Sequence, residues 1–322
     1  MGRQVCGRSA RAHDSLAAFS WFQERWPRRI GSRVARNKEM QASTIDAKTA
    51  NAEQRNSPHI QLFIPVRNGA NYIRECIESI VTQTYRNWSL TVSDNQSTDS
   101  TEEIVASFLS DSRITWVRQA SNVGLIGNFN SCIDRATADF YAVLAHDDKY
   151  FAADALEKSL AILQCDATLC AVYSNVLWID GKSKPIIELK LPKAGKLQSD
   201  FIALRSIICC RNQFGMPLLN RRADVGDCRY GVQFPHAADI DFSIAVGKGK
   251  FIYVLNEPKV AIRFHGSNNT MRDFSQLRPE ILAIARNRGL TLSAVQRAQM
   301  FVNDHLTRLK KRLFFLYLDY VR

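Results

Sequence analysis

The sequence predicts an α/β fold in which a mostly parallel β-sheet is flanked by helices and followed by a C-terminal helical extension. From His59 onward, short apolar runs alternate with segments whose apolar residues recur at helical spacing. The apolar runs show no regular alternation with polar residues, which suits strands covered on both faces. Strands alternating with helices are typical of βαβ units in a parallel sheet.

The predicted elements follow in order. In the first half, strands are expected at 60–66, 88–94, 114–118 and 140–145, with helices at 71–84, 97–109 and 124–137. After residue 150 the alternation loosens. Helices are expected there at 153–164, 199–210 and 238–249, and strands at 170–180, 250–255 and 259–265, with a turn at 180–185.

Charge and composition limit the classes of function. The 322 residues are 46% hydrophobic, and no apolar run approaches the length of about 18 residues that spans a membrane. The net charge of +12 comes from the two ends: residues 1–39 and 275–322 each hold nine Lys and Arg against three Asp and Glu. Because residues 40–274 are neutral, we expect no nucleic-acid partner.

Residues 1–57 differ from the rest of the chain. They are rich in Arg and then polar, so we expect a disordered extension, or one translated from a misassigned start codon upstream of Met40. The apolar stretch "LAAFSWF" lacks a cleavage site, so it is not a signal peptide. The eight cysteines form no CxxC pair, which favours reduced, buried thiols in a cytoplasmic protein.

Polar segments follow three of the predicted strands. "PVRNG" (65–69) ends the first, "SDNQSTDST" (93–101) ends the second and "HDD" (146–148) ends the fourth. Ligands of open α/β sheets bind outside the carboxyl ends of the strands. Two adjacent acids at such an edge favour a divalent cation with oxygen ligands, and the cation could hold a diphosphate.

Two long segments carry a family resemblance. "IPVRNGANYIRECIESIVTQTYRNWSLTVSDNQSTDSTEEI" (64–104) and "SNVGLIGNFNSCIDRATADFYAVLAHDD" (121–148) resemble the family 2 glycosyltransferases, which have the Rossmann-like GT-A fold. The resemblance covers about residues 58–270. It implies a metal-dependent, inverting enzyme of the bacterial cell-surface polysaccharide type. Such an enzyme would move a sugar from a nucleoside-diphosphate sugar to a hydroxyl of a glycan or lipid-linked acceptor.

The resemblance also implies roles for single residues. Asp239 would be the general base, and Asp147 and His265 would hold Mg²⁺ or Mn²⁺. Asp94 would recognise the nucleotide base. The other residues expected to border the donor are Pro65, Arg67, Asn68, Asn95, Asn122, Gly124, Asn128 and Asp148.

Structural alternatives exist for several of these residues. Asp94 and the Asn68-Gly69 pair suit turns, and Ser97, Thr98 and Asp99 suit a helix cap. Asp239 could be a cap at a helix start, and His265 a structural histidine.

Two departures from the family pattern motivate a second hypothesis. Ala145 stands where the family has the first acid of its DXD motif, and Ala238 stands where it has the Glu before the base. The alternative function is therefore a non-catalytic nucleotide-binding or scaffold module of the same fold.

The C-terminal segment 302–322 has an apolar stripe. Val302, Leu306, Leu309, Leu313 and Tyr317 lie opposite Arg308, Lys311 and Arg312 on a helix. Either the stripe docks on the domain, or the helix lies on anionic lipid at the inner face of the cell membrane. We expect three parts: the extension 1–57, a GT-A domain 58–272, and a basic amphipathic helical part 273–322.

Overall fold

The computed structural model describes residues 57–191, 193–265 and 276–321. Contacts divide the chain into the units Met1–Ala50 and Asn51–Arg322, and the described residues lie in the second unit. The predictions about residues 1–56, including a start at Met40, fall outside the described residues.

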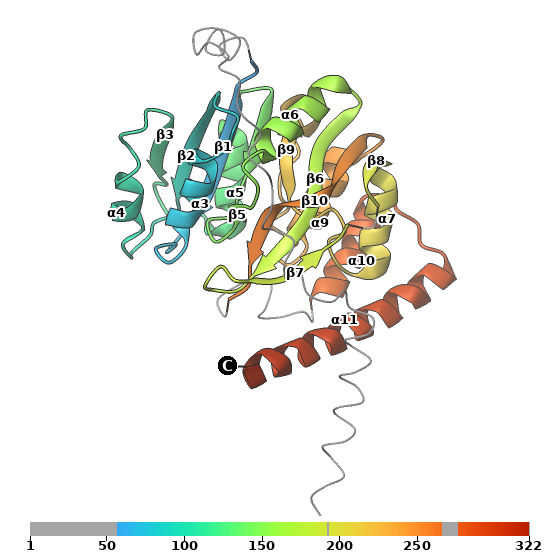
Figure 1. The fold of residues 1–322 in the computed structure, drawn as a ribbon. Helices are drawn as coiled ribbons and strands as arrows, with labels where there is room; N and C mark the ends of the chain where they lie inside the picture. The colour runs from blue at the N-terminus through green and yellow to red at the C-terminus, as the bar shows by residue number, and fades with distance from the viewer. Residues whose placement is uncertain (1–56, 192, 266–275, 322) are drawn as a thin grey trace, which may run out of the picture. The chain divides into compact units, whose positions relative to one another are not determined.

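The first half of the sheet is the parallel arrangement that the sequence predicts. Its four strands are β1 (Ile60–Val66), β2 (Trp88–Asp94), β3 (Ile114–Arg118) and β4 (Phe140–Val143). They pair in the order β3-β2-β1-β4, all parallel. The connecting helices are α3 (Ile73–Val81), α4 (Thr101–Ala106) and α5 (Gly124–Arg135). This order brings the carboxyl ends of β1, β2 and β4 to one edge of the sheet (Figure 1).

The second half of the sheet is mixed. β9 (Pro217–Arg221) lies antiparallel between β4 and β6 (Leu169–Ile179), and β6 pairs in parallel with β10 (Phe251–Arg263). The strands β5 (Lys149–Tyr150), β7 (Pro185–Leu189) and β8 (Gly195–Gln198) add antiparallel pairs. None of β5, β7, β8 and β9 was predicted from the sequence.

One predicted boundary was wrong. The sequence predicts two strands, 250–255 and 259–265, whereas the structure has the single strand β10. The register of β10 against β6 shifts around Pro258. Proline has no N–H to donate to a ladder, so the strand bulges there and continues.

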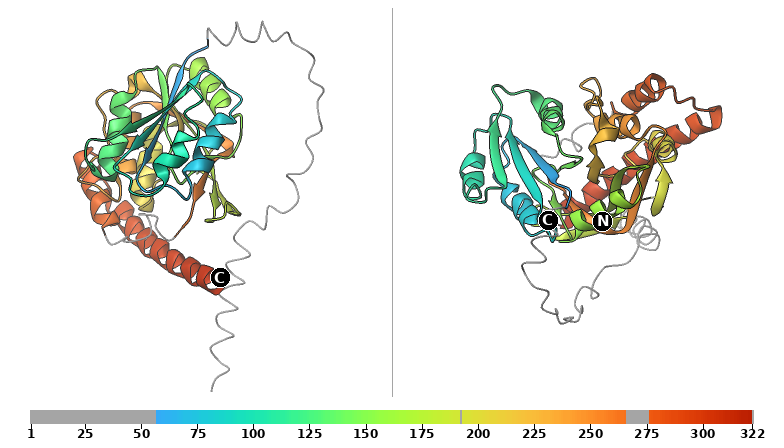
Figure 2. Two further views of the ribbon diagram at one scale, coloured as in Figure 1. Left: turned by 90° about the vertical axis from the view of Figure 1, so that its left-hand side faces the viewer. Right: turned by 90° about the horizontal axis from the view of Figure 1, so that it is seen from above.

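Two apolar cores cover opposite faces of the sheet. Leu62 and Ile64 of β1 pack with residues of α3, α4 and α6 (Ala155–Cys165). Phe63 points to the other face, where the core includes α5, α7 (Ser199–Cys209), α9 (Ala238–Gly247) and α10 (Leu277–Asn287). This two-sided burial explains why the strands read as continuous apolar runs (Figures 1 and 2). The short helix α8 (Arg222–Val225) follows β9.

The described chain ends in the long helix α11 (Ala294–Val321), whose second half extends away from the sheet (Figures 1 and 2). Its first half docks on α7, where Asn303 Nδ2 donates to Ile208 O at 3.0 Å and Met300 is buried. No helix within the described residues is both long and apolar enough to cross a membrane. Cys76, Cys132, Cys170 and Cys210 are buried, Cys165 is exposed, and none of these five forms a disulfide among the described residues.

Candidate active site

The loops after β1 and β2 are tied together by side chains that the sequence marks as polar. Asn68 N donates to Ser97 Oγ at 2.9 Å, and Thr98 N donates to Asn68 Oδ1 at 2.8 Å. Asn68 has a positive φ of 54°, which asparagine tolerates better than most residues. Asp99 Oδ1 accepts from Thr101 N at 3.1 Å, at the start of α4. These bonds hold the two strand ends in one rigid edge.

Asp94 lies at the end of β2 and is fully buried. Its carboxylate accepts from Ser97 N at 3.0 Å, and Arg118 Nη1 lies 3.4 Å from its Oδ2. Arg118 also donates to Ser97 O at 3.0 Å. Asp94 is therefore fixed in place by a turn and a cation. Its expected role in recognising a nucleotide base stays a prediction.

Three asparagines predicted to border the donor are engaged by the protein itself. Asn95 Nδ2 donates to Asn122 Oδ1 at 2.9 Å and to Gly124 O at 3.1 Å. Asn128 Nδ2 donates to Ser93 O at 2.9 Å, and Ser93 Oγ donates to Asn128 Oδ1 at 2.7 Å. These amides fix the loop that leads into α5.

The other residues predicted at this edge differ in exposure. Pro65 is buried in β1, whereas Arg67 is exposed just after it. Gly124 has a φ of 76°, a conformation that favours glycine, at the start of α5. Among these three, only Arg67 presents a charge to solvent. Their contacts with a donor stay predictions.

The structure brings together the two residues predicted to hold a metal. His265 Nε2 lies 3.0 Å from Asp147 Oδ2, and their side chains are 13% and 17% exposed. A carboxylate oxygen and an imidazole nitrogen suit Mn²⁺, and the carboxylate suits Mg²⁺. Within the described residues, no group of three or more His, Cys, Asp and Glu gathers in a metal-holding arrangement. A cation at this pair would therefore need further ligands from a diphosphate or from water.

Asp148 lies beside this pair but is turned into the protein. Its Oδ1 accepts from the main-chain N of Arg263 at 2.9 Å, and the residue is buried. Burial raises the pKa of Asp148 well above its usual range, and the charge of Asp147 raises it further. Asp148 thus joins the HDD segment to the end of β10, and its expected place beside the nucleotide stays a prediction.

A buried arginine that the sequence analysis missed organises the same region. Arg263 is 1% exposed. Its Nε donates to Asp147 O at 2.9 Å, and its Nη2 lies 3.1 Å from Glu75 Oε2. Its guanidinium also lies 4.6 Å from the ring centroid of Tyr72, and that ring lies 4.8 Å from the ring of His265. A cation within the apolar run "KVAIRF" was the available signal, because buried charges need partners.

Asp239 occupies the first turn of α9. The residue is exposed to solvent, although protein atoms lie densely around its carboxylate. This desolvation raises the pKa of Asp239, while a hydrogen bond from Asn212 and one from the Ile240 N–H lower it. Two residues later, Asp241 is buried and forms a bidentate pair with Arg288, at 2.8 and 2.9 Å. Of the two acids, only Asp239 is exposed.

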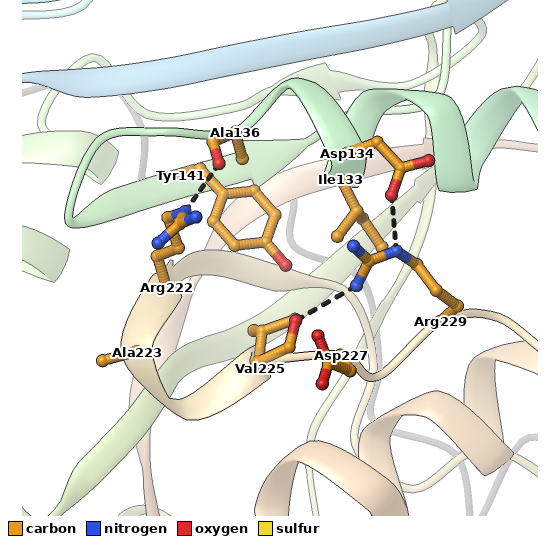
Figure 3. Close-up of a pocket in the computed structure, with 10 residues that line it drawn as sticks. Ile133, Asp134, Ala136, Tyr141, Arg222, Ala223, Val225, Asp227 and Arg229 are labelled. Carbon is orange, nitrogen blue, oxygen red and sulfur yellow. Dashed lines mark hydrogen bonds and ion pairs between the residues drawn. The ribbon is translucent and has the colours of Figure 1, made fainter.

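A separate cavity of about 240 Å³ lies between the end of α5 and α8 (Figure 3). Its lining includes Ile133, Tyr141, Arg222, Val225 and Arg229. None of the predicted site residues lines it. The Tyr141 hydroxyl is buried there and has no hydrogen-bond partner among the described residues. The residues predicted to form the donor site therefore lie outside this cavity.

Comparisons with known proteins concern the family and the fold of this chain. The sequence model described as glycosyl transferase family 2 matches residues 62–216, which include Asp94 and Asp147 but neither Asp239 nor His265. An uncharacterized glycosyltransferase of Rickettsia prowazekii (strain Madrid E) is 28% identical over 226 residues, 69% of each chain. Another, from Rickettsia typhi, is 33% identical over 135 residues, which are 42% of this chain and 41% of that protein.

A solved structure extends the likeness to the fold. Residues 1–349 of S. aureus TarS, in complex with UDP-GlcNAc, align with a TM-score of 0.61 and 16% sequence identity. The alignment covers 77% of this chain and 73% of that one. At this identity the likeness concerns the fold alone. The sequence match makes residues 62–216 of this chain similar to glycosyltransferase family 2, and the architecture is the GT-A type of α/β fold.

Proposed function

We propose that this chain is a metal-dependent, inverting glycosyltransferase that moves a sugar from a nucleoside-diphosphate sugar to an acceptor hydroxyl. The observation that carries the proposal is the Asp147–His265 pair, 3.0 Å apart at the strand ends. These residues are 118 positions apart in the sequence. A carboxylate and an imidazole are both side chains that can hold a metal ion, and their meeting at the strand ends supports a shared ligand there.

In this mechanism Asp239 removes the proton from the acceptor hydroxyl. The acceptor oxygen forms a bond to the anomeric carbon as the bond from that carbon to the diphosphate oxygen breaks. Attack from the face opposite the leaving group inverts the configuration. The raised pKa of Asp239 suits a base, because its proton affinity exceeds that of an ordinary carboxylate.

Asp147 and His265 are the residues that would hold Mg²⁺ or Mn²⁺ beside the donor diphosphate. When bound, such an ion supplies positive charge that offsets the charge of the leaving diphosphate. Arg263 Nε donates to the main-chain O of Asp147 at 2.9 Å, which fixes the backbone that carries the carboxylate. Asp94 and the asparagine-lined loop would bind the nucleoside end.

The donor class is proposed from chemistry and likeness together. TarS was solved with UDP-GlcNAc, which makes a uridine nucleotide the first donor to test. We propose a glycan or a lipid-linked sugar as acceptor, in surface polysaccharide or glycolipid synthesis. The helical part 273–322 is proposed to contact anionic lipid, because Val302, Leu306 and Leu309 are exposed on α11.

Calorimetric binding of UDP, dTDP and GDP to the full chain, with Mn²⁺ and with EDTA, tests the proposal. We expect one nucleotide to bind with Mn²⁺ and to bind at least tenfold more weakly in EDTA. Asp147→Asn should lose this metal dependence, whereas the control Asp227→Asn, an exposed acid, should keep it. Equal binding by both variants would show that Asp147 is not a metal ligand.

Donor turnover separates the enzyme from the alternative, a non-catalytic nucleotide-binding module. Ala145 and Ala238, in place of two family acids, favour that alternative. It predicts nucleotide binding without release of the nucleoside diphosphate from any sugar donor. The enzyme predicts release that Asp239→Asn lowers by roughly 10²- to 10⁴-fold.

A further inference from the structure

The segment after α7 folds around one side chain, that of Asn212. Its Oδ1 accepts from Phe214 N at 2.8 Å and from Gly215 N at 3.3 Å. Main-chain N–H groups only donate, so the oxygen of the amide must face them. The orientation of the amide is therefore fixed: Nδ2 donates one hydrogen bond within the loop, to Gly215 O at 3.3 Å, and its other N–H faces the opposite way.

Asp239 lies on that opposite side. Asn212 Nδ2 donates to Asp239 Oδ2 at 2.8 Å, and Ile240 N donates to Asp239 Oδ1 at 2.9 Å. Each oxygen of the carboxylate thus has one fixed donor. A carboxylate oxygen accepts more than one hydrogen bond, so both keep capacity for another hydroxyl.

We propose that Asn212 is a positioning residue for Asp239, holding the carboxylate in one orientation and in its charged form for the acceptor hydroxyl. The inference rests on the proposed role of Asp239 as general base. Main-chain N–H groups of the loop fix the orientation of the Asn212 amide, and the amide in turn fixes the orientation of the Asp239 carboxylate. Misplacing a catalytic group by a small distance is costly, so such support has a large effect on turnover.

The groups that face Asp239 define its electrostatics. Tyr173 of β6 and Tyr230, which precedes α9, both sense its charge, and burial raises the pKa of each phenol well above its usual range. Arg288 is engaged by Asp241. Desolvation raises the pKa of Asp239, and the bond from Asn212 is the leading influence that lowers it.

Two substitutions separate positioning from a purely structural role. Asn212→Asp keeps the oxygen that accepts from Phe214 and Gly215, loses only the 3.3 Å donation from Nδ2 to Gly215 O within the loop, and places a second carboxylate against Asp239. Asn212→Leu removes both functions at similar volume. The measurement is kcat and KM for the donor as a function of pH, on the full chain with Mn²⁺.

We expect kcat to fall at least about tenfold in both variants, with little change in the donor KM, and by less than in Asp239→Asn. The pH at which kcat falls on the acidic side should rise in both variants, because each loses the Asn212 donor that favours charged Asp239. It should rise further in Asn212→Asp, where a second negative charge also disfavours the charged form of Asp239. Asn87→Asp is the control. The Asn87 amide donates to Ser57 O at 2.7 Å and makes no hydrogen bond with Asn212 or Asp239 in the described part of the chain, so this variant should behave as the wild type.

The outcomes distinguish the two claims. Normal turnover and an unmoved limb in Asn212→Asp, with Asp239→Asn inactive, would overturn the positioning role and leave the base in place. Normal turnover in Asp239→Asn would overturn the base and the inference together. A folding defect in Asn212→Leu would leave Asn212→Asp as the deciding variant.

Discussion

Glu75 shows how a single residue connects the site to the rest of the protein. Its carboxylate accepts from Lys149 Nζ at 2.8 Å and from Ser183 Oγ at 2.5 Å, and it pairs with Arg263. Glu75 and Arg263 are 188 positions apart in the sequence. This cluster joins α3, the β6–β7 turn and the end of β10 beneath the Asp147–His265 pair.

Glu75 should make stability depend on pH. Burial alone would raise its pKa, but the bonds from Lys149 and Ser183 and the charge of Arg263 lower the pKa to about 2, from 4.5. A lowered acid pKa adds stability that is complete above about pH 4.5 and is lost as the pH falls toward 2. The Glu75 side chain is 41% exposed, so solvent screening reduces the effect to about 1–2 kcal/mol.

We therefore expect Glu75→Gln to flatten the fall in unfolding free energy between pH 4.5 and pH 2, measured by urea denaturation at a series of pH values. Glu78→Gln, an exposed acid on the same helix, is the matched control and should keep the wild-type slope. Identical slopes in wild type and Glu75→Gln would show that the cluster does not hold the charge.

At the same scale, residues of the candidate site differ in how the sequence marks them. The acids after β4 directly follow an apolar run, whereas His265 was expected only from the family resemblance, and the metal-binding roles of Asp147 and His265 stay predictions. Arg263 and Asn212 were not predicted as parts of the site. Their importance comes from partners that the fold supplies, namely Asp147 O for Arg263 and Asp239 for Asn212.

At the scale of elements, the strands of the parallel half were predicted, whereas the antiparallel strands β5, β7, β8 and β9 were not. β1 and β2 match their predicted bounds, because both faces of these apolar runs are largely buried. β9 follows no recognisable pattern in the sequence, and it is a strand because β4 and β6 pair with it on either side. Its existence depends on neighbours, which no local pattern records.

The exposure of α11 bears on the two interpretations of its apolar stripe, docking on the domain or contact with lipid. Val302, Leu306 and Leu309 are 54%, 46% and 54% exposed, while Met300 and Asp304 of the same helix are buried. The stripe therefore does not dock on the domain at these three positions, and the expectation of docking is wrong there. The side chains of Leu313 and Tyr317 lie outside the described residues.

Flotation with vesicles tests whether this face contacts lipid. We expect the full chain to float with phosphatidylglycerol vesicles and less with phosphatidylcholine vesicles, since residues 275–322 carry a net charge of +6. A triple variant should float at least tenfold less; it carries Val302→Ser, Leu306→Ser and Leu309→Ser. Serines at Leu109, Phe201 and Val232, three exposed apolar residues outside α11, are the matched control. Equal flotation of the two triple variants would reject contact through the stripe.

At the scale of the whole described body, the candidate site is shared by two halves of one sheet. Asp147 follows β4 in the parallel half, and His265 follows β10 on the other side of β9. The residues that match the family model end at 216, before β9, so they contain only one of these two residues. A ligand bound by both halves should stabilise the entire body and not one half.

Thermal unfolding tests whether a ligand bound by both halves stabilises the entire body. At Mn²⁺ and nucleotide concentrations about 100-fold above the dissociation constant, binding should add roughly 2.7 kcal/mol to the unfolding free energy and raise Tm in one cooperative transition. Either ligand alone should give a smaller shift, because each completes the site for the other. Asp147→Asn and His265→Ala, one from each half, should lose the joint effect to a similar degree, while Asp227→Asn keeps it. A joint effect that survives either substitution would place the metal elsewhere, and two separate transitions would mean that the halves do not share the ligand.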